Sequence, residues 1–169
     1  MNIVITGFMG TGKTTISQKL SKKLGWDYVD TDKIIEKNTN MNITDIFSKF
    51  GETHFRNLET EAAKISMEKD KQVIATGGGI VLKDENMDIF KTNAVIINLS
   101  AKAETIYKRI RGSKTRPLLN KPEPLKEINR LLKARSRFYK ECNYRVITDG
   151  LNVNQIVNKI YDYLKKNKY

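Results

Sequence analysis

The first residues suited to chemistry form a glycine-rich loop that ends in a lysine and a threonine. The segment Gly7–Thr14 matches the pattern G-x-x-x-x-G-K-[ST], known as Walker A. Its glycines allow a tight turn that aims backbone N–H groups at phosphate oxygens. Lys13 can reach the β- and γ-phosphates of a nucleotide, and the Thr14 hydroxyl can ligate Mg²⁺. A chance match is the alternative, but an apolar run before the loop and an amphipathic helical pattern after it favour phosphate binding.

Two carboxylates, Asp30 and Asp32, stand two residues apart where a second apolar run ends. At the end of a strand they can divide the chemistry of phosphoryl transfer. One can hold Mg²⁺, directly or through water, and the other can accept a hydrogen bond from the attacking hydroxyl. The structural alternative is that Asp32 caps the helix that follows, because Asp is a favoured N-cap residue. The two roles are compatible, and the pair alone does not decide between them.

A third pattern brings an aromatic ring, an arginine and a carboxylate together. In Gly51–Glu59, the side chains of Phe55, Arg56 and Glu59 fall within about one helical turn. Either Arg56 and Glu59 form an exposed ion pair of little energetic value, or Arg56 forms a planar fork that grips a carboxylate. His54 is the only histidine. We expect it at the surface, because one histidine makes no metal site.

Glycines and arginines further along the chain extend the candidate site. Gly77–Gly79 follow another apolar run, and they permit either close approach of a ligand to the backbone or a flexible turn; the place at a strand end favours a site. The segment 112–124 contains one glycine and three prolines and has no regular apolar period. Such a segment is usually a functional lid or a disordered stretch, and as a lid it would bring Arg116 over a transferring phosphate.

The elements that must position these residues alternate along the chain. Five apolar runs are predicted to be strands: Asn2–Thr6, Tyr28–Asp30, Gln72–Ala75, Ala94–Leu99 and Arg145–Ile147. Helical patterns lie between them, which predicts one parallel sheet covered by helices on both faces, a three-layer α/β/α fold of one domain over residues 1–169. Ligands of such sheets bind beyond the carboxyl ends of the strands, where the motifs fall.

Composition narrows the class of protein. The formal net charge of +12 is compatible with nucleic-acid binding, with anionic small ligands, or with lysine-rich solvated surfaces, and the scattered lysines favour the last. Cys142 is the only cysteine, so no internal disulfide forms, and we expect a reducing, cytoplasmic setting. No apolar run approaches about 20 residues, and the N-terminus lacks a basic leader. We expect neither a membrane span nor a signal peptide.

With these motifs in this order, the chain resembles the shikimate kinase family. The match runs through nearly the whole length: Gly7–Thr14, Asp30-x-Asp32, Gly51–Glu59, Gly77–Gly79, Arg109, Arg116–Leu119 and Arg135-x-x-x-Tyr139. The resemblance implies a P-loop NTPase fold like that of nucleoside monophosphate kinases, with a five-stranded parallel sheet, a substrate-binding segment at 32–60 and a lid at 112–124. It also implies transfer of the γ-phosphoryl group of ATP to the 3-hydroxyl of shikimate, on the route to chorismate and the aromatic amino acids.

The resemblance assigns roles residue by residue. It implies ATP binding by Gly10, Thr11, Gly12, Lys13, Thr14, Thr15, Arg109, Arg116 and Val153. It implies shikimate binding by Asp32, Arg56, Glu59, Gly77, Gly78, Gly79 and Arg135, with the two arginines on the carboxylate and Glu59 orienting Arg56. Catalysis falls to Lys13, Asp32 and Arg116, and Mg²⁺ to Thr14 and Asp30. The implied partners are ATP and shikimate, acting on a monomer without nucleic acid or membrane.

Two departures and two alternatives remain open at this stage. The stretch Ser100–Arg116 is slightly longer than in the family, so Arg109 or Arg111 flanks the adenine. The loop Asp149–Asn154 lacks the expected proline, so Val153 or Asn154 packs on the base. Gluconate kinase or another small-molecule kinase would share the Walker A loop but not the acceptor motifs. A nucleic-acid-binding P-loop module would need aromatics interleaved with arginines, a stripe that the sequence lacks.

Overall fold

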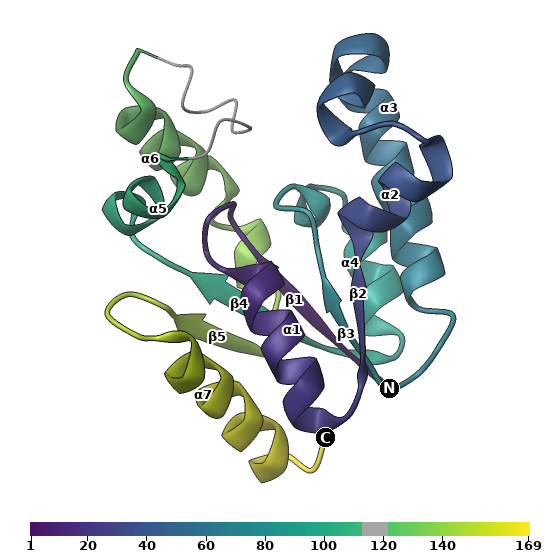
Figure 1. The fold of residues 1–169 in the computed structure, drawn as a ribbon, viewed down its shortest axis with the longest axis vertical. Coiled ribbons are helices and arrows are strands. Elements are labelled where there is room, and N and C mark those ends of the chain that lie inside the picture. The colour runs from purple at the N-terminus through teal and green to yellow at the C-terminus, as the bar shows by residue number, and fades with distance from the viewer. Residues whose placement is uncertain (113–121) are drawn as a thin grey trace.

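Five parallel strands form a single sheet at the centre of the molecule (Figure 1). The computed structural model describes residues 1–112 and 122–169. The strands are β1 Asn2–Gly7, β2 Asp27–Asp30, β3 Gln72–Ala75, β4 Ala94–Ser100 and β5 Tyr144–Ile147. Their order across the sheet is β2-β3-β1-β4-β5, and every neighbouring pair is parallel. The strands predicted from apolar runs are therefore confirmed to within a residue at each end.

Helices cover both faces of this sheet. The α-helices are α1 Lys13–Leu24, α2 Thr31–Thr39, α3 Ile43–Ser66, α4 Asp84–Lys91, α5 Ala103–Ile110, α6 Pro124–Arg135 and α7 Val153–Lys166. Short 3₁₀ turns, η1 Ile80–Leu82 and η3 Phe138–Lys140, follow the third strand and the sixth helix. No helix in the described ranges is long and apolar enough to cross a membrane.

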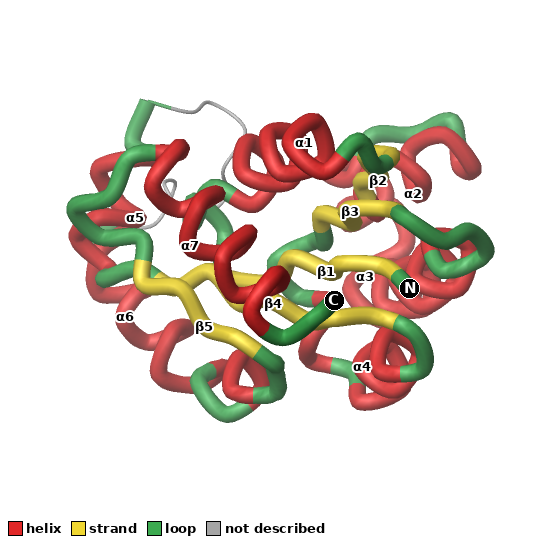
Figure 2. Tube along the Cα trace, turned by 90° about the horizontal axis from the view of Figure 1, so that it is seen from below, coloured by secondary structure: helices red, strands yellow, loops and turns green. Residues whose placement is uncertain are grey.

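Alternate strand residues point to two separate cores. Ile3 and Ile5 of β1 pack with α1 and α7, whereas Val4 packs with residues of α3, α4, α5 and α6. Figure 2 shows this layering, with α1 and α7 on one side of the strands and α4 and α6 on the other. The predicted three-layer α/β/α fold is confirmed, because each face of a buried parallel sheet needs its own helical cover.

The helices α2 and α3 form a small unit at the β2 edge of the sheet, held by its own cluster of Ile35, Ile46, Phe55 and Ala62. Helix α3 is kinked at Gly51, whose φ of 78° and ψ of 177° lie outside the helical region. A side chain would be strained at that positive φ, so glycine allows the turn. The kink redirects the second half of α3, which carries Arg56 and Glu59, relative to the first half.

The structure describes only the two ends of the predicted lid, residue 112 and residues 122–124. Residues 113–121, including Arg116, lie outside the described residues. At its far end, Pro124 occupies the first turn of α6, where its fixed φ suits the helix and its missing N–H costs nothing. The helix therefore begins at the last residue of the segment that we expected to be irregular.

Candidate active site

The three motifs that follow strands β1, β2 and β3 lie at one edge of the sheet. Strands β2, β3 and β1 are neighbours, and at their carboxyl ends stand Asp30–Asp32, Gly77–Gly79 and the Walker A loop. Figure 1 places this edge between the α2–α3 unit and the α5–α6 pair. The sequence predicted that these motifs lie beyond the carboxyl ends of the strands, and the sheet order shows that the three strands are neighbours.

The Walker A loop has the form of a phosphate cradle. The Lys13 ammonium donates to the carbonyl oxygens of Gly7 at 2.9 Å and Phe8 at 3.2 Å, so its charge is held over the loop. Gly12 is the N-cap of α1 and supplies no side-chain cap, which leaves first-turn N–H groups for an anion. Thr14 is exposed on that turn, as is its neighbour Thr15.

Thr11 has a different position from the other predicted nucleotide-binding residues. It is buried, and both its N–H, at 3.3 Å, and its hydroxyl, at 2.7 Å, donate to the carbonyl oxygen of Phe8. These bonds close the loop from within. Thr11 therefore shapes the cradle, and its hydroxyl is already committed to the protein.

Asp30, not Asp32, is the N-cap of helix α2. One Asp30 carboxylate oxygen accepts from the backbone N–H of Asp32 at 3.0 Å and of Lys33 at 3.4 Å. The structural alternative in which Asp32 caps the helix is therefore wrong, because the helix begins two residues earlier than that alternative requires. Asp32 lies in the first turn instead, where its carboxylate faces the glycine loop.

Tyr28 supports the same carboxylate from the strand. Its hydroxyl donates to the second Asp30 oxygen at 2.9 Å. Burial, and then the Asp30 charge, raise the pKa of Tyr28 well above its usual range, so the hydroxyl stays protonated as a donor. The Tyr28 hydroxyl also interacts with the side chains of Thr14 and Gln18. It therefore lies between Thr14 and Asp30, the two residues expected to serve Mg²⁺. Sequence reasoning missed Tyr28, although its spacing of two from Asp30 on a strand was the available signal.

The residues present fit a hydrated Mg²⁺. A carboxylate offers about four lone-pair sites, and the three donors on Asp30 leave room for one more, such as a metal-bound water. Within the described ranges, no group of three His, Cys, Asp or Glu residues could enclose a metal ion. Mg²⁺ typically keeps several waters and binds through one or two protein oxygens plus substrate phosphates, which is what Thr14 and Asp30 can offer.

Arg56 is half-buried and Glu59 is buried, so the first of the two sequence interpretations, an exposed pair, is wrong. The Glu59 side chain is 1% exposed and the Arg56 side chain 19%. Arg56 Nη1 donates to Glu59 Oε2 at 2.5 Å, while Nε and Nη2 donate to Glu52. Two of the five guanidinium N–H groups then lack a hydrogen-bond partner among the residues described, enough for a bidentate contact with a carboxylate.

Burial raises the pKa of the Glu59 carboxyl from its ordinary 4.5 to about 7, against the opposing charge of Arg56. The folded protein therefore holds this proton more tightly than the unfolded chain. The stability from this group is complete below the unfolded pKa and is lost as pH rises through the folded pKa. We expect the wild type to lose stability relative to Glu59→Gln between about pH 4.5 and 8, measured by urea unfolding. A constant difference between the two would contradict this titration.

The Gly77–Gly79 loop fits closely against the acceptor side chains. A Cβ at Gly77 would lie 2.7 Å from Asp32 Oδ1 and 3.0 Å from Glu59 Oε1. A Cβ at Gly79 would lie 2.2 Å from Arg56 Nη1, and one at Gly78 would lie 3.3 Å from the backbone nitrogen of Met9. The absence of side chains is thus required for close approach, and the loop meets the Walker A loop as well.

Arg135 approaches the same place from the other side. It is the last residue of α6, and its guanidinium lies 5.8 Å from the centre of the Phe8 ring in the Walker A loop. Its charge acts on Glu59, whose pKa it lowers, as does that of Arg56. The structure therefore brings the two arginines toward one carboxylate, as a site for an anionic acceptor needs.

Arg109 joins the Walker A loop to the loop after β5. Its Nη1 donates to the Thr148 hydroxyl at 3.0 Å and its Nη2 to the Thr148 carbonyl at 3.1 Å. Arg111 is exposed beyond the end of α5. Val153 is half-buried at the start of α7 and packs on the core, whereas Asn154 is exposed. Of the two arginines, Arg109 contacts both the Walker A loop and the loop after β5.

Comparison with known proteins shows the family of the chain. The family model described as shikimate kinase matches residues 9–165. The chain belongs to the shikimate kinase family. It is 45% identical to the shikimate kinase of Thermodesulfovibrio yellowstonii, over 99% of this chain and 98% of that protein. It is 42% identical to that of Thermoanaerobacter pseudethanolicus, over 98% of each.

Solved structures of the family superpose on the whole chain. Shikimate kinase from Acinetobacter baumannii, in complex with shikimate, has a TM-score of 0.93 at 33% identity, covering 99% of this chain and 94% of that one. Shikimate kinase from Aquifex aeolicus has a TM-score of 0.87 at 33% identity, covering 99% and 98%. The resemblance that the motifs indicated is thereby confirmed, as is the P-loop kinase fold.

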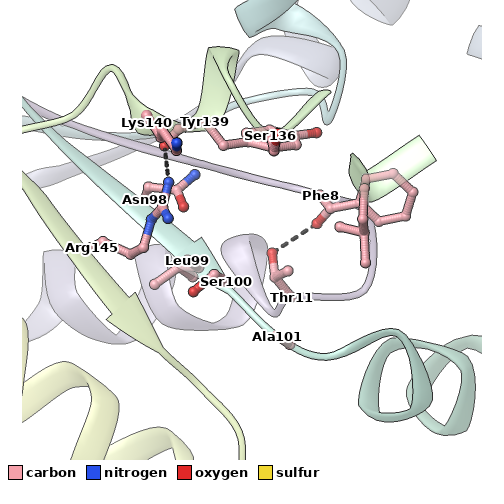
Figure 3. Close-up of a pocket in the computed structure, with 11 residues that line it drawn as sticks. Phe8, Thr11, Asn98, Leu99, Ser100, Ala101, Ser136, Tyr139, Lys140 and Arg145 are labelled. Atoms are coloured by element: carbon pink, nitrogen blue, oxygen red, sulfur yellow. Dashed lines mark hydrogen bonds between the residues drawn. The ribbon is translucent and has the colours of Figure 1, made fainter. Parts of the chain in front are cut away.

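A cavity of about 140 Å³ lies behind the Walker A loop (Figure 3). It is lined from the loop by Phe8 and Thr11, from β4 by Asn98–Ala101, and from the region of α6 and η3 by residues that include Tyr139. It is smaller than the usual range of ligand pockets, about 300–1,000 Å³. One lining residue, Tyr139, also contacts the glycine loop through its hydroxyl.

Proposed function

We infer that the chain is a shikimate kinase, which transfers the γ-phosphoryl group of ATP to the 3-hydroxyl of shikimate. The observation that carries this inference is the Arg56–Glu59 pair packed on Gly77–Gly79, beside a Walker A loop. The loop supplies a phosphate cradle, and the pair supplies an arginine fork for a carboxylate. Shikimate carries one carboxylate and three hydroxyls, which match the two arginines and Asp32. The products are shikimate 3-phosphate and ADP.

On the donor side, the Walker A backbone and Lys13 hold the phosphates of ATP. We propose that the Lys13 ammonium, now bonded to loop carbonyls, turns to the β- and γ-phosphates when nucleotide enters. Thr14 and Asp30 would hold Mg²⁺, which when bound neutralises charge on the phosphates. Arg109 and Val153 would flank the adenine. Arg116, which lies outside the described residues, is proposed to bind the phosphates as well.

On the acceptor side, Arg56 and Arg135 bind the carboxylate and thereby fix the ring. Asp32 accepts a hydrogen bond from the 3-hydroxyl, and it takes the proton as the hydroxyl oxygen bonds to the γ-phosphorus. The bond from that phosphorus to the bridging oxygen of ADP breaks in the same displacement. Orientation accounts for much of such catalysis, because the chemistry needs the two oxygens nearly in line.

The test of this function is release of ADP by the purified protein. Mg-ATP is supplied with shikimate, with gluconate or with an oligonucleotide, and ADP is measured by a coupled assay. We expect release that depends on shikimate and is abolished by a chelator of Mg²⁺. Release that depends on gluconate or on nucleic acid, and not on shikimate, would overturn the proposal.

Arg56→Lys is expected to weaken shikimate binding by about 1.5–3 kcal/mol, or about 10- to 150-fold in KM for shikimate. Lysine keeps the charge but loses the planar fork that engages Glu59 and a carboxylate together. The KM for ATP should change little. Arg130→Lys is the matched control, because Arg130 is an exposed arginine paired with Glu127 on α6. Loss of ATP affinity with intact shikimate affinity would place Arg56 on the wrong ligand.

A further inference from the structure

The glycine loop Gly77–Gly79 is the part of the acceptor site with the least freedom to move. Its backbone contacts Asp32, Glu59 and Arg56 so closely that an added methyl group would overlap each of them. Local hydrogen bonds shape the loop, since the Gly77 carbonyl accepts from the Ile80 N–H at 3.4 Å and the Gly79 carbonyl from the Leu82 N–H at 2.9 Å. Hydrogen bonds from other segments then fix the loop relative to the acceptor side chains.

One of these hydrogen bonds comes from the residue between the two aspartates. The Gly77 N–H donates to the Thr31 hydroxyl oxygen at 3.1 Å, and Thr31 is fully buried. The bond spans 46 residues of sequence. It joins the start of α2, which carries Asp32, to the start of the glycine loop. The distance between the candidate base and the loop is thus set by one side chain.

The second hydrogen bond comes from the opposite wall of the site. The Tyr139 hydroxyl donates to the Gly78 carbonyl at 2.7 Å, and Tyr139 is 7% exposed. Tyr139 lies in η3, four residues after Arg135, and its own carbonyl accepts from Arg145 at 2.8 Å. Tyr139 also lines the cavity of Figure 3. The hydroxyl bond ties the segment that carries Arg135 to the glycine loop.

We propose that Thr31 and Tyr139 are positioning residues that clamp the glycine loop and so set the geometry of the acceptor site. Thr31 fixes the loop relative to Asp32, and Tyr139 fixes it relative to Arg135. Together they determine how far the proton acceptor stands from the arginines that grip the carboxylate. We expect the clamp to act on shikimate more than on ATP, because neither hydroxyl bonds to the Walker A loop, although Gly78 itself lies against that loop. This inference rests on the function proposed above.

The experiment compares variants that remove one hydroxyl each. Thr31→Val and Tyr139→Phe keep the shape of the side chain and lose the bond, whereas Thr31→Ser keeps the acceptor. The control is Tyr163→Phe, which removes a tyrosine hydroxyl that donates to the Asn143 carbonyl at 3.0 Å, on α7. The values of kcat and KM are measured for both substrates, and folding is followed by circular dichroism and thermal unfolding.

We expect Thr31→Val and Tyr139→Phe each to raise the KM for shikimate about tenfold, the ordinary effect of one lost hydrogen bond, with the KM for ATP within about twofold. Thr31→Ser and Tyr163→Phe should behave as the wild type. Because both bonds hold one loop, the double variant should not show the product of the single effects. A merely structural role would lower stability without this division between substrates.

Different outcomes would overturn the clamp and the proposed function. An equal change in both KM values, or a loss of stability alone, would overturn the clamp. If Thr31→Val fails to fold, Tyr139→Phe decides by itself, because it removes a single oxygen from a residue beside a cavity. A wild-type protein that ignores shikimate would refute the proposed function, an outcome distinct from unchanged variants of an active enzyme, which would refute only the clamp.

Discussion

Replacing Lys13 with alanine is expected to lower kcat by about 10²–10³-fold while leaving the fold intact, the range seen when a preorganised charge or donor is removed from a transition state. The lysine stands at the junction of the Walker A loop and α1, and its ammonium already points over the loop through bonds to Gly7 and Phe8. It belongs to neither large hydrophobic cluster of the described residues. Its loss therefore removes charge from the phosphate site and leaves core packing unchanged.

The measurement is kcat at saturating ATP and shikimate, with thermal unfolding as a check on the fold. Lys22→Ala is a matched control, because Lys22 is exposed in the last turn of the same helix and lines a groove with residues of α7. The control should retain wild-type turnover. Near-normal turnover of Lys13→Ala at saturating ATP would mean that the loop binds phosphate without the help of this charge.

The fold was predictable because its signals are local. Each strand is a short apolar run, as in Asn2–Thr6, and a helical pattern separates it from the next. Parallel pairing follows from such crossovers. The strand order β2-β3-β1-β4-β5 does not follow from them, because helices can cover both faces of a sheet in more than one order. The position of the Walker A loop was predictable for the same reason, since a loop that follows β1 must emerge at the carboxyl edge.

The packing of the site was not predictable from spacing. Residues 56 and 59 have the same i, i+3 relation in an exposed pair and in a buried one, and contact with Gly79, 23 residues beyond Arg56, helps to bury them. The observed cap of α2 is Asp30, two residues before the Asp32 that the sequence suggested, because a local pattern leaves helix ends uncertain by one or two residues. The bonds from Thr31 and Tyr139 join segments 46 and 61 residues apart.

Asp32→Asn is expected to lower kcat by about 10²–10⁴-fold, the usual contribution of a positioned general base. The amide has nearly the shape of the carboxylate and can still accept a hydrogen bond, but it cannot take the proton of the 3-hydroxyl. Asp32 Oδ1 faces the Gly77 backbone, and its charge raises the pKa of Glu59, so the residue lies within the acceptor site. Asp30 should not be changed in the same experiment, because it caps α2.

The values of kcat and KM distinguish the two roles that the sequence left open for Asp32. A base affects kcat, and the KM for shikimate should then change by only a few-fold; a residue that merely binds hydroxyls affects KM and leaves kcat. Asp88→Asn is the control, since Asp88 is 74% exposed on α4. If Asp32→Asn keeps kcat and raises only the KM for shikimate, a group other than Asp32 must accept the proton of the 3-hydroxyl. Asp32 would then be a binding residue that orients the 3-hydroxyl toward the phosphate.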